Sequence, residues 1–108
     1  MTPTTLQMLF TPISIGKVRL RNRVVMAPMG TRLSSFGGWP TERSRDYYAA
    51  RARGGVGLVV MEFAGVTRTG RGSHHTGGLY DDRMIPNYRM VVEAIHGHGA
   101  KAALQLAH

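Results

Sequence analysis

The sequence contains no cysteine. Disulfides, zinc-thiolate sites, iron-sulfur ligation and cysteine nucleophiles are therefore excluded within these 108 residues. Long apolar runs are also missing, because no window approaches the ~20 apolar residues that a membrane-crossing helix needs. The N-terminal MTPTTLQMLF lacks the basic region and long apolar stretch of a secretory signal. These absences predict a soluble, cytoplasmic protein with no membrane partner.

Acidic residues are scarce. The sequence has 6 Asp and Glu against 14 Lys and Arg, a formal net charge of +8 that would attract the phosphates of a nucleic acid, a cofactor or a substrate. Most basic residues are arginines spread from Arg19 to Arg89 without a run of five like charges, and the aromatic residues do not interleave with them. We therefore expect no nucleic-acid partner. A nucleic-acid binder would instead show salt-sensitive retention on DNA.

The first elements predicted are a hairpin and a buried strand. Residues 13–20 alternate apolar and polar side chains on both sides of Gly16-Lys17, which is typical of a two-residue hairpin with glycine at its first central position. Ile15 should then face Val18, and Ile13 should face Leu20. The apolar run over about 24–27, which ends at Pro28, predicts a strand buried on both faces.

Two helices follow at different points of the chain. The first is predicted over about 42–53, with Thr41 as its N-cap and Gly54-Gly55 able to adopt the left-handed conformation at its end. The second is predicted over about 86–96. Pro86 suits its first position, and one apolar stripe contains Tyr88, Val91, Val92 and Ile95.

Apolar runs predict two more strands, over about 56–61 and 101–106, and the glycine-rich stretch 65–78 is expected to be a long loop. Alternating strands and helices indicate right-handed βαβ units with a parallel sheet. The predicted strands start near residues 24, 56 and 101. Repeats of this length suit a (β/α)8 TIM barrel, whose eight units need about 250 residues. Residues 1–108 are therefore interpreted as an incomplete barrel, with its first three strands and two helices after the hairpin. More chain, or another chain, should complete the fold.

The carboxyl ends of parallel strands carry the functional site in such folds. This rule selects three segments on one rim: Ala27-Pro-Met-Gly30, Met61-Glu-Phe-Ala-Gly65 and Gln105-Leu-Ala-His108. Glu62 could be a buried functional carboxylate or the partner of one of the many arginines, and we favour the ion pair. Gln105 alone could equally be a polar residue satisfied between barrel layers.

Several motifs occur together in a fixed order. They are Leu9-Phe-Thr-Pro-Ile13, Leu20-Arg-Asn-Arg-Val-Val-Met-Ala-Pro-Met29, Arg51-Ala-Arg-Gly-Gly-Val-Gly-Leu58 and Gln105-Leu-Ala-His108. From Leu9 to His108 the chain resembles the old yellow enzyme family of NADH:flavin oxidoreductases. Its branch is similar to the 2,4-dienoyl-CoA reductases and enoate reductases, which Gly78-Leu-Tyr-Asp-Asp82 and Ile85-Pro86 also fit.

The resemblance implies an FMN lying across the top of the barrel. Ala27, Pro28, Met29 and Gly30 would line the flavin, and backbone near Phe63 would touch it. Gln105 would contact the pyrimidine edge, where its amide offers both a donor and an acceptor. His108 has two possible roles: it could lie close to the flavin or the substrate, or it could be a packing residue.

The implied activity is that of an ene-reductase in the full-length protein, with hydride passing from NAD(P)H through FMN to an activated alkene or enoyl substrate. No catalytic residue can be assigned in this segment. In the closest branch a 4Fe-4S cluster and FAD would lie beyond His108, and a homo-oligomer is expected. The alternative is a non-catalytic truncated barrel segment that assembles with another chain.

Two positions depart from the pattern or invite another interpretation. Gly30 stands where many relatives have a Thr, Cys or His that interacts with the flavin, and we hypothesise that Thr31 substitutes for it through a small loop shift. The pair His74-His75 invites a metal site, but adjacent side chains diverge and no third ligand lies at useful spacing. We therefore expect no metal.

Overall fold

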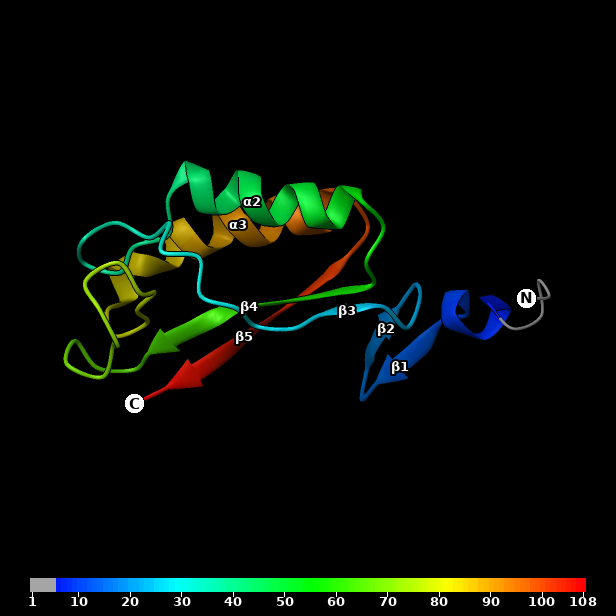
Figure 1. Ribbon diagram of the computed structural model, residues 1–108, viewed down its shortest axis with the longest axis horizontal. Helices are drawn as coiled ribbons and strands as arrows, with labels where there is room; N and C mark the ends of the chain where they lie inside the picture. The colour runs from blue at the N-terminus through cyan, green and yellow to red at the C-terminus, as the bar shows by residue number, and fades with distance from the viewer. Residues whose placement is uncertain (1–5) are drawn as a thin grey trace.

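The computed structural model describes residues 6–108, and Figure 1 shows their path. A three-stranded sheet lies under two helices, and a separate hairpin lies beside its amino end (Figure 1). In chain order the elements are η1 (Met8–Phe10), β1 (Ile13–Ile15), β2 (Val18–Leu20), β3 (Val25–Met26), α2 (Glu42–Arg53), β4 (Leu58–Gly65), η2 (Asp82–Met84), α3 (Ile85–Gly97) and β5 (Lys101–Ala107).

The hairpin β1–β2 has the predicted register. Ile13 pairs with Leu20 and Ile15 with Val18 in antiparallel fashion. Gly16 has φ +58°, the left-handed conformation that a glycine at the first central position supplies without steric cost. The hairpin therefore forms as its alternation and turn residues indicate.

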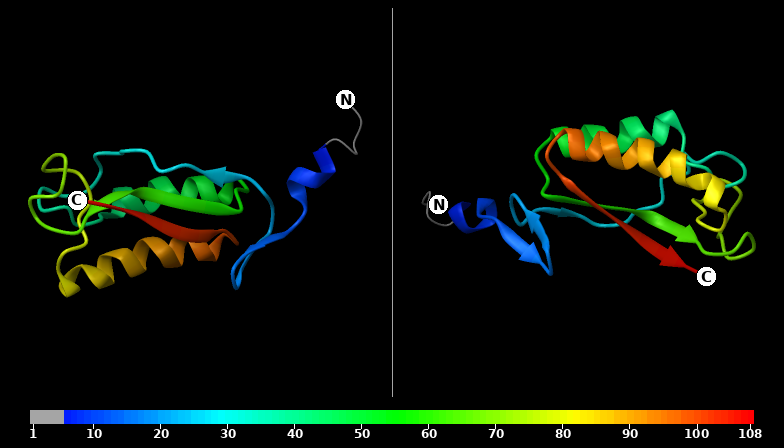
Figure 2. Two further views of the ribbon diagram at one scale, coloured as in Figure 1. Left: turned by 90° about the horizontal axis from the view of Figure 1, so that it is seen from below. Right: turned by 180° about the vertical axis from the view of Figure 1, so that it is seen from behind.

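The main sheet is parallel and has the order β3-β4-β5. Met26 pairs with Val59, and Val59 pairs with Ala102, so the three strands start in register and run the same way. Both connections contain a helix, and Figure 2 shows α2 and α3 on the same face of the sheet. The carboxyl ends of all three strands consequently point toward one end of the molecule.

The core lies between the helices and this face of the sheet. The apolar stripe predicted for the second helix points into it, since Val91 and Ile95 are buried and Tyr88 and Val92 are partly buried. The other buried members of the core are Met26, Tyr48, Ala52, Val59, Met61 and Ala100. Burial of side chains on one stripe and one sheet face is what stabilises two-layer α/β packing.

The opposite face of the sheet is uncovered in residues 6–108. Val25 points away from the helices and is 47% exposed, so the prediction that this strand is buried on both faces is wrong for this chain. The strand is also shorter than the predicted 24–27, because its pairing with β4 ends at Met26. As an edge strand, β3 has a paired neighbour on one side only.

Strand β4 begins later and ends later than the predicted 56–61. Its pairing with β5 continues past an irregularity to the pairs Ala64–Leu106 and Gly65–Ala107. Phe63 therefore lies inside the strand and not in a loop after it. The irregularity is a bulge, in which Met61 pairs with Leu104 and the next pair is Ala64–Leu106.

The glycine-rich loop after β4 is closed at its base by backbone hydrogen bonds. Gly65 N donates to Gly77 O over 3.0 Å, and Leu79 N donates to Gly65 O over 2.8 Å. Gly78 N then donates to Gly38 O over 2.9 Å, which joins this loop to the one between β3 and α2. Gly38 has φ +88°, and a Cβ built on it would lie 2.8 Å from Gly78 N, so the close approach requires glycine.

Candidate functional site

The residues predicted to bind a cofactor lie at the carboxyl end of the sheet. Ala27 to Gly30 follow β3 directly, Phe63 lies near the end of β4, and Gln105 and His108 lie at the end of β5. Ala27 continues the register of Met26–Val59–Ala102, and so it shares a sheet face with Ala103 and Gln105. This is the face opposite the helices. We call the set formed by Ala27, Pro28, Met29, Gly30, Phe63, Gln105 and His108 the open rim.

Most of the open rim is accessible to solvent. Met29 is 51% exposed, and Ala27, Gly30, Gln105 and His108 are also exposed. A Cβ built on Gly30 meets no atom within 4 Å. Among residues 6–108, no side chain or backbone group hydrogen-bonds to the Gln105 amide. The open rim is thus an exposed surface with small residues and one free amide, and a flat ligand can reach it.

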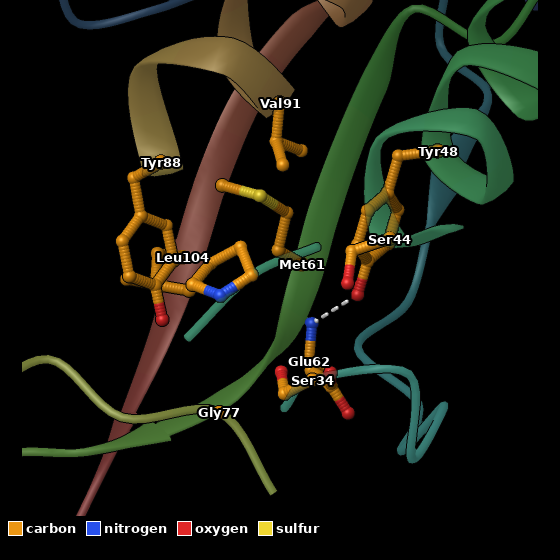
Figure 3. Close-up of a pocket in the computed structure, with 10 residues that line it drawn as sticks. Ser34, Ser44, Tyr48, Met61, Glu62, Gly77, Tyr88, Val91 and Leu104 are labelled. Carbon is orange, nitrogen blue, oxygen red and sulfur yellow. Dashed lines mark hydrogen bonds between the residues drawn. The ribbon is translucent and has the colours of Figure 1, made fainter. Parts of the chain in front are cut away.

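The enclosed part of the carboxyl end lies on the other face, under the helices. A cavity of about 20 Å³, roughly the space of one water molecule, is lined by residues from β4, both helices and the loops (Figure 3). Its polar lining includes Glu62, Tyr48 and Tyr88. None of the residues predicted for the cofactor lines it.

Glu62 is buried, 7% exposed, and its carboxylate binds a residue of the β3–α2 loop. Thr31 N donates to Oε2 over 2.8 Å, and the Thr31 hydroxyl donates to Oε1 over 2.9 Å. Neither of the two ion pairs in residues 6–108, Arg45–Asp46 and Arg83–Asp81, involves Glu62. The prediction that Glu62 pairs with an arginine is therefore wrong, because two neutral donors of Thr31 satisfy the carboxylate instead.

Tyr48 and Tyr88 line the cavity from the two helices. The Tyr48 hydroxyl accepts the backbone N–H of Glu62 over 2.9 Å (Figure 3), and the Tyr88 hydroxyl donates to Gly78 O over 2.8 Å. Burial raises the pKa of Tyr48 to about 12, and burial also raises the pKa of Tyr88. Both phenols therefore stay neutral at physiological pH and act here as hydrogen-bonding groups.

The loop over residues 66–78 is organised by Arg71. Its guanidinium donates to the backbone oxygens of Phe36 and His74, over 3.2 and 2.9 Å. The His74 ring stacks on Phe36 with centroids 4.4 Å apart, and His75 Nδ1 lies 3.0 Å from Ser34 O. No group of three or more potential metal ligands gathers anywhere in residues 6–108.

The strand ends select from the sequence the three segments that contain the open rim, and the family resemblance selects its individual residues. Sequence reasoning missed the pairing of Thr31 with Glu62. The signal that could have found it is a charged residue inside an apolar run. Glu62 directly follows Val59-Val-Met61, and a carboxylate buried there needs hydrogen-bond donors. Sequence reasoning treats Thr31 only as a group facing a flavin. Its hydroxyl instead donates to Glu62 and accepts Leu33 N over 3.1 Å.

No helix in residues 6–108 combines the length and the apolar character that a bilayer crossing demands.

Comparison with known proteins supplies independent findings. Residues 8–108 match the model of the NADH:flavin oxidoreductase / NADH oxidase family. An NADPH dehydrogenase of Listeria welshimeri is 40% identical over 101 residues, which are 93% of this chain and 30% of that protein. An NADH oxidase of Thermoanaerobacter brockii is 41% identical over 101 residues, 93% of this chain and 16% of that protein. The chain thus spans about a third or less of these relatives.

Solved structures match over the same range. The old yellow enzyme homologue from Zymomonas mobilis has a TM-score of 0.84 at 31% identity, over 93% of this chain and 28% of its own. Morphinone reductase in complex with tetrahydroNAD has a TM-score of 0.82 at 36% identity, over 93% of this chain and 27% of its own. These overlaps confirm the fold prediction, the first three strands and two helices of a (β/α)8 barrel.

Proposed function

Because this chain belongs to the NADH:flavin oxidoreductase / NADH oxidase family, we propose that it forms the part of an FMN-dependent oxidoreductase that holds one edge of the flavin. The observation that carries the proposal is the open rim. Three parallel strands bring Ala27, Gly30 and Gln105 to one end of the sheet. This is where ligands bind in parallel α/β folds.

The residues of the open rim fit a flavin in shape and in chemistry. The space above Gly30 is free, so a flat ring can approach the backbone there. The Gln105 amide is exposed and has no partner within residues 6–108, and it can donate one hydrogen bond and accept another. That combination suits the pyrimidine edge of FMN, which presents N3–H beside a carbonyl oxygen. Pro28, Met29 and Phe63 would pack around the ring, and His108 would lie close to it.

The chemistry that a bound FMN supplies is hydride transfer, from NAD(P)H to the flavin and onward to an activated C=C bond of an alkene or enoyl substrate. The residues of this chain would bind the FMN and orient it. Gln105 would hold the pyrimidine edge of the flavin through its amide donor and acceptor, and Ala27 to Gly30 would support the ring. Hydrogen bonds at that edge also favour the anionic reduced form, so these residues tune the potential.

The branch within the family is also a proposal. We place the chain nearest the 2,4-dienoyl-CoA reductases and enoate reductases, whose members would add a 4Fe-4S cluster and FAD beyond His108. The relatives differ in size, because 101 aligned residues make up 30% of the Listeria protein and 16% of the Thermoanaerobacter protein. The second is therefore about twice as long. A full-length protein of the longer kind would support the additional cofactors, and one of the shorter kind would contradict them.

The test of the proposed function is flavin loading followed by reduction. The full-length protein should purify yellow with FMN, should bleach on anaerobic addition of NADH or NADPH, and should regain its colour when an activated alkene is added. A full-length protein that refolds with FMN but remains colourless would contradict the proposal. A cytoplasmic location and a homo-oligomeric state remain predictions, which fractionation and light scattering would check.

The uncovered sheet face favours a second candidate for the 108-residue chain by itself, a non-catalytic segment that assembles with another chain. Val25 at the start of β3 is 47% exposed on that face, and Gln105 near the end of β5 is exposed as well. A colourless oligomer of the 108-residue chain on a sizing column would support this candidate. A yellow monomer of the same chain would contradict it.

A further inference from the structure

The bulge in β4 contains Glu62, whose buried carboxylate lies against the β3–α2 loop. Between the pairs Met61–Leu104 and Ala64–Leu106, Glu62 and Phe63 oppose the single residue Gln105. In a regular strand Glu62 would point to the opposite face from Met61. Met61 and Glu62 both line the cavity, and Figure 3 shows the Met61 side chain directed toward Val91 and the Glu62 carboxylate directed away from it. The carboxylate lies instead against Thr31 of the β3–α2 loop. Bulges commonly re-aim a side chain next to a functional site.

The Glu62 carboxylate holds the loop that forms one side of the open rim. Both of its oxygens accept hydrogen bonds from Thr31, 31 residues earlier, at 2.8 and 2.9 Å. Hydrogen bonds to a charged acceptor are about twice as strong as neutral ones. The backbone of Glu62 is itself fixed, because its N–H donates to the buried Tyr48 hydroxyl. The carboxylate is thus a rigid anchor on a strand.

The segment from Ala27 to Arg32 has little else to fix it. The ladder with β4 ends at the pair Met26–Val59, and within residues 6–108 Thr31 is the member of this segment whose side chain reaches another element. The next residue, Arg32, has φ +58°, a conformation that costs a non-glycine residue about 1 kcal/mol or more and persists only where neighbouring contacts hold it. The contacts beside it are those of Thr31.

We propose that Glu62 is a positioning residue for the flavin, and that it acts by clamping Thr31 so that Met29 and Gly30 are held at a fixed height at the open rim. This inference rests on the proposed function. The carboxylate touches neither flavin nor substrate. It sets, through Thr31, the backbone that does. Preorganised backbone of this kind lowers the entropy cost of binding a ligand.

The experiment compares Thr31→Val with Thr31→Ser in the full-length protein. Valine keeps the shape of threonine and loses the hydroxyl, while serine keeps the hydroxyl. FMN dissociation constants are measured on the apoprotein by flavin fluorescence quenching, and the flavin midpoint potential is measured on the loaded protein. We expect Thr31→Val to raise the dissociation constant about tenfold, the loss of one good hydrogen bond, and Thr31→Ser to stay within about twofold of wild type. Glu62→Gln should act in the same direction as Thr31→Val.

Tyr88→Phe is the matched control. It also removes one hydroxyl hydrogen bond at the same cavity, to Gly78 O, without touching the clamp. Its melting temperature should fall while its FMN dissociation constant stays within about twofold of wild type. If Glu62→Gln does not fold, the FMN dissociation constants of the two Thr31 variants test the proposal.

Two results overturn the proposal. Wild-type affinity and potential in a folded Thr31→Val protein would show that the clamp does not position the flavin. An equal loss of affinity in Tyr88→Phe would show that any loss of stability weakens binding. In both cases wild type still binds FMN, so the proposed function stands. A wild-type protein that binds no FMN would instead contradict the proposed function, and the inference with it.

Discussion

Arg21 joins the carboxyl ends of both helices to the start of the sheet. Its guanidinium donates to His98 O over 2.7 Å, to Ala52 O over 2.8 Å and to Val56 O over 3.0 Å. The last carbonyls of a helix lack partners within the helix, and a cation there is stabilised by the helix dipole. One side chain therefore fixes three chain segments that lie far apart in the sequence.

The change that tests this role is Arg21→Met, which keeps an unbranched apolar stem and removes all the donors. Val56 O and His98 O then lose their donor, while Ala52 O keeps the N–H of Gly55 over 3.0 Å. We expect the free energy of unfolding to fall by about 1.5–3 kcal/mol. Urea denaturation of the full-length protein measures it. Arg19→Met is the control, because Arg19 is exposed on β2 and its side chain makes no hydrogen bond within residues 6–108. An equal loss in both variants would contradict the role of Arg21.

Tyr48 gives stability a dependence on alkaline pH. Burial raises its pKa to about 12 from an ordinary 10.0, so the fold favours the neutral phenol. A raised pKa means that the stabilisation is complete below pH 10 and is lost as the pH rises through about 12. We expect the free energy of unfolding to decline over that interval, and to decline less steeply in Tyr48→Phe. Unfolding curves at stepped pH measure it, and identical slopes in the two proteins would contradict it.

At the scale of elements, α2 begins with a reciprocal cap. The Thr41 hydroxyl accepts Ser44 N over 3.2 Å, and Ser44 Oγ accepts Thr41 N over 3.1 Å. The same Thr41 hydroxyl donates to Leu33 O over 2.7 Å, so the cap also ties the helix to the loop that leads from β3. Two free N–H groups at the start of the helix are satisfied in this way.

Removal of this cap should cost stability. Thr41→Ala is expected to lower the free energy of unfolding by about 1–2 kcal/mol, while Thr41→Ser should lower it by less than about 0.5 kcal/mol because the hydroxyl remains. Thermal unfolding followed by circular dichroism measures both. Equal stability of the alanine and serine variants would show that the hydroxyl does not support the helix.

The elements with local signals were predictable from the sequence. Thr41 and Gly54-Gly55 mark the ends of α2, Gly16 marks the hairpin turn, and the helical spacing of Val91 and Ile95 marks the buried stripe of α3. Each signal is a property of a few neighbouring residues. Strand order and direction followed from the alternation of strands and helices.

The bulge and the clamp were not predictable in this way. The bulge depends on how β4 pairs with β5, about 40 residues later, and no local pattern at Glu62 announces it. The hydrogen bonds between Thr31 and Glu62 join residues 31 positions apart, so no local pattern predicts this pairing either. The three segments that contain the open rim were predictable because they need only the strand ends, and the family resemblance supplied the individual residues.

At the scale of the whole molecule, residues 6–108 leave apolar surface uncovered. Val25 is 47% exposed, Leu106 is 60% exposed, and the outer edge of β5 has no paired strand in the described chain. An unpaired strand edge next to apolar side chains is prone to association. The 108-residue chain by itself should therefore associate at micromolar concentration. Sedimentation velocity measures this, and a stable monomer would contradict the interpretation that these apolar surfaces and the β5 edge need a cover.

The central claim is that the carboxyl ends of β3, β4 and β5 hold one edge of an FMN. The most direct measurement is a crystal structure of the full-length protein loaded with FMN. We predict that the isoalloxazine ring lies over Ala27 to Gly30, with its pyrimidine edge about 3 Å from the Gln105 amide. A flavin bound at the amino ends of these strands, or one whose pyrimidine edge has no contact with Gln105, would contradict it.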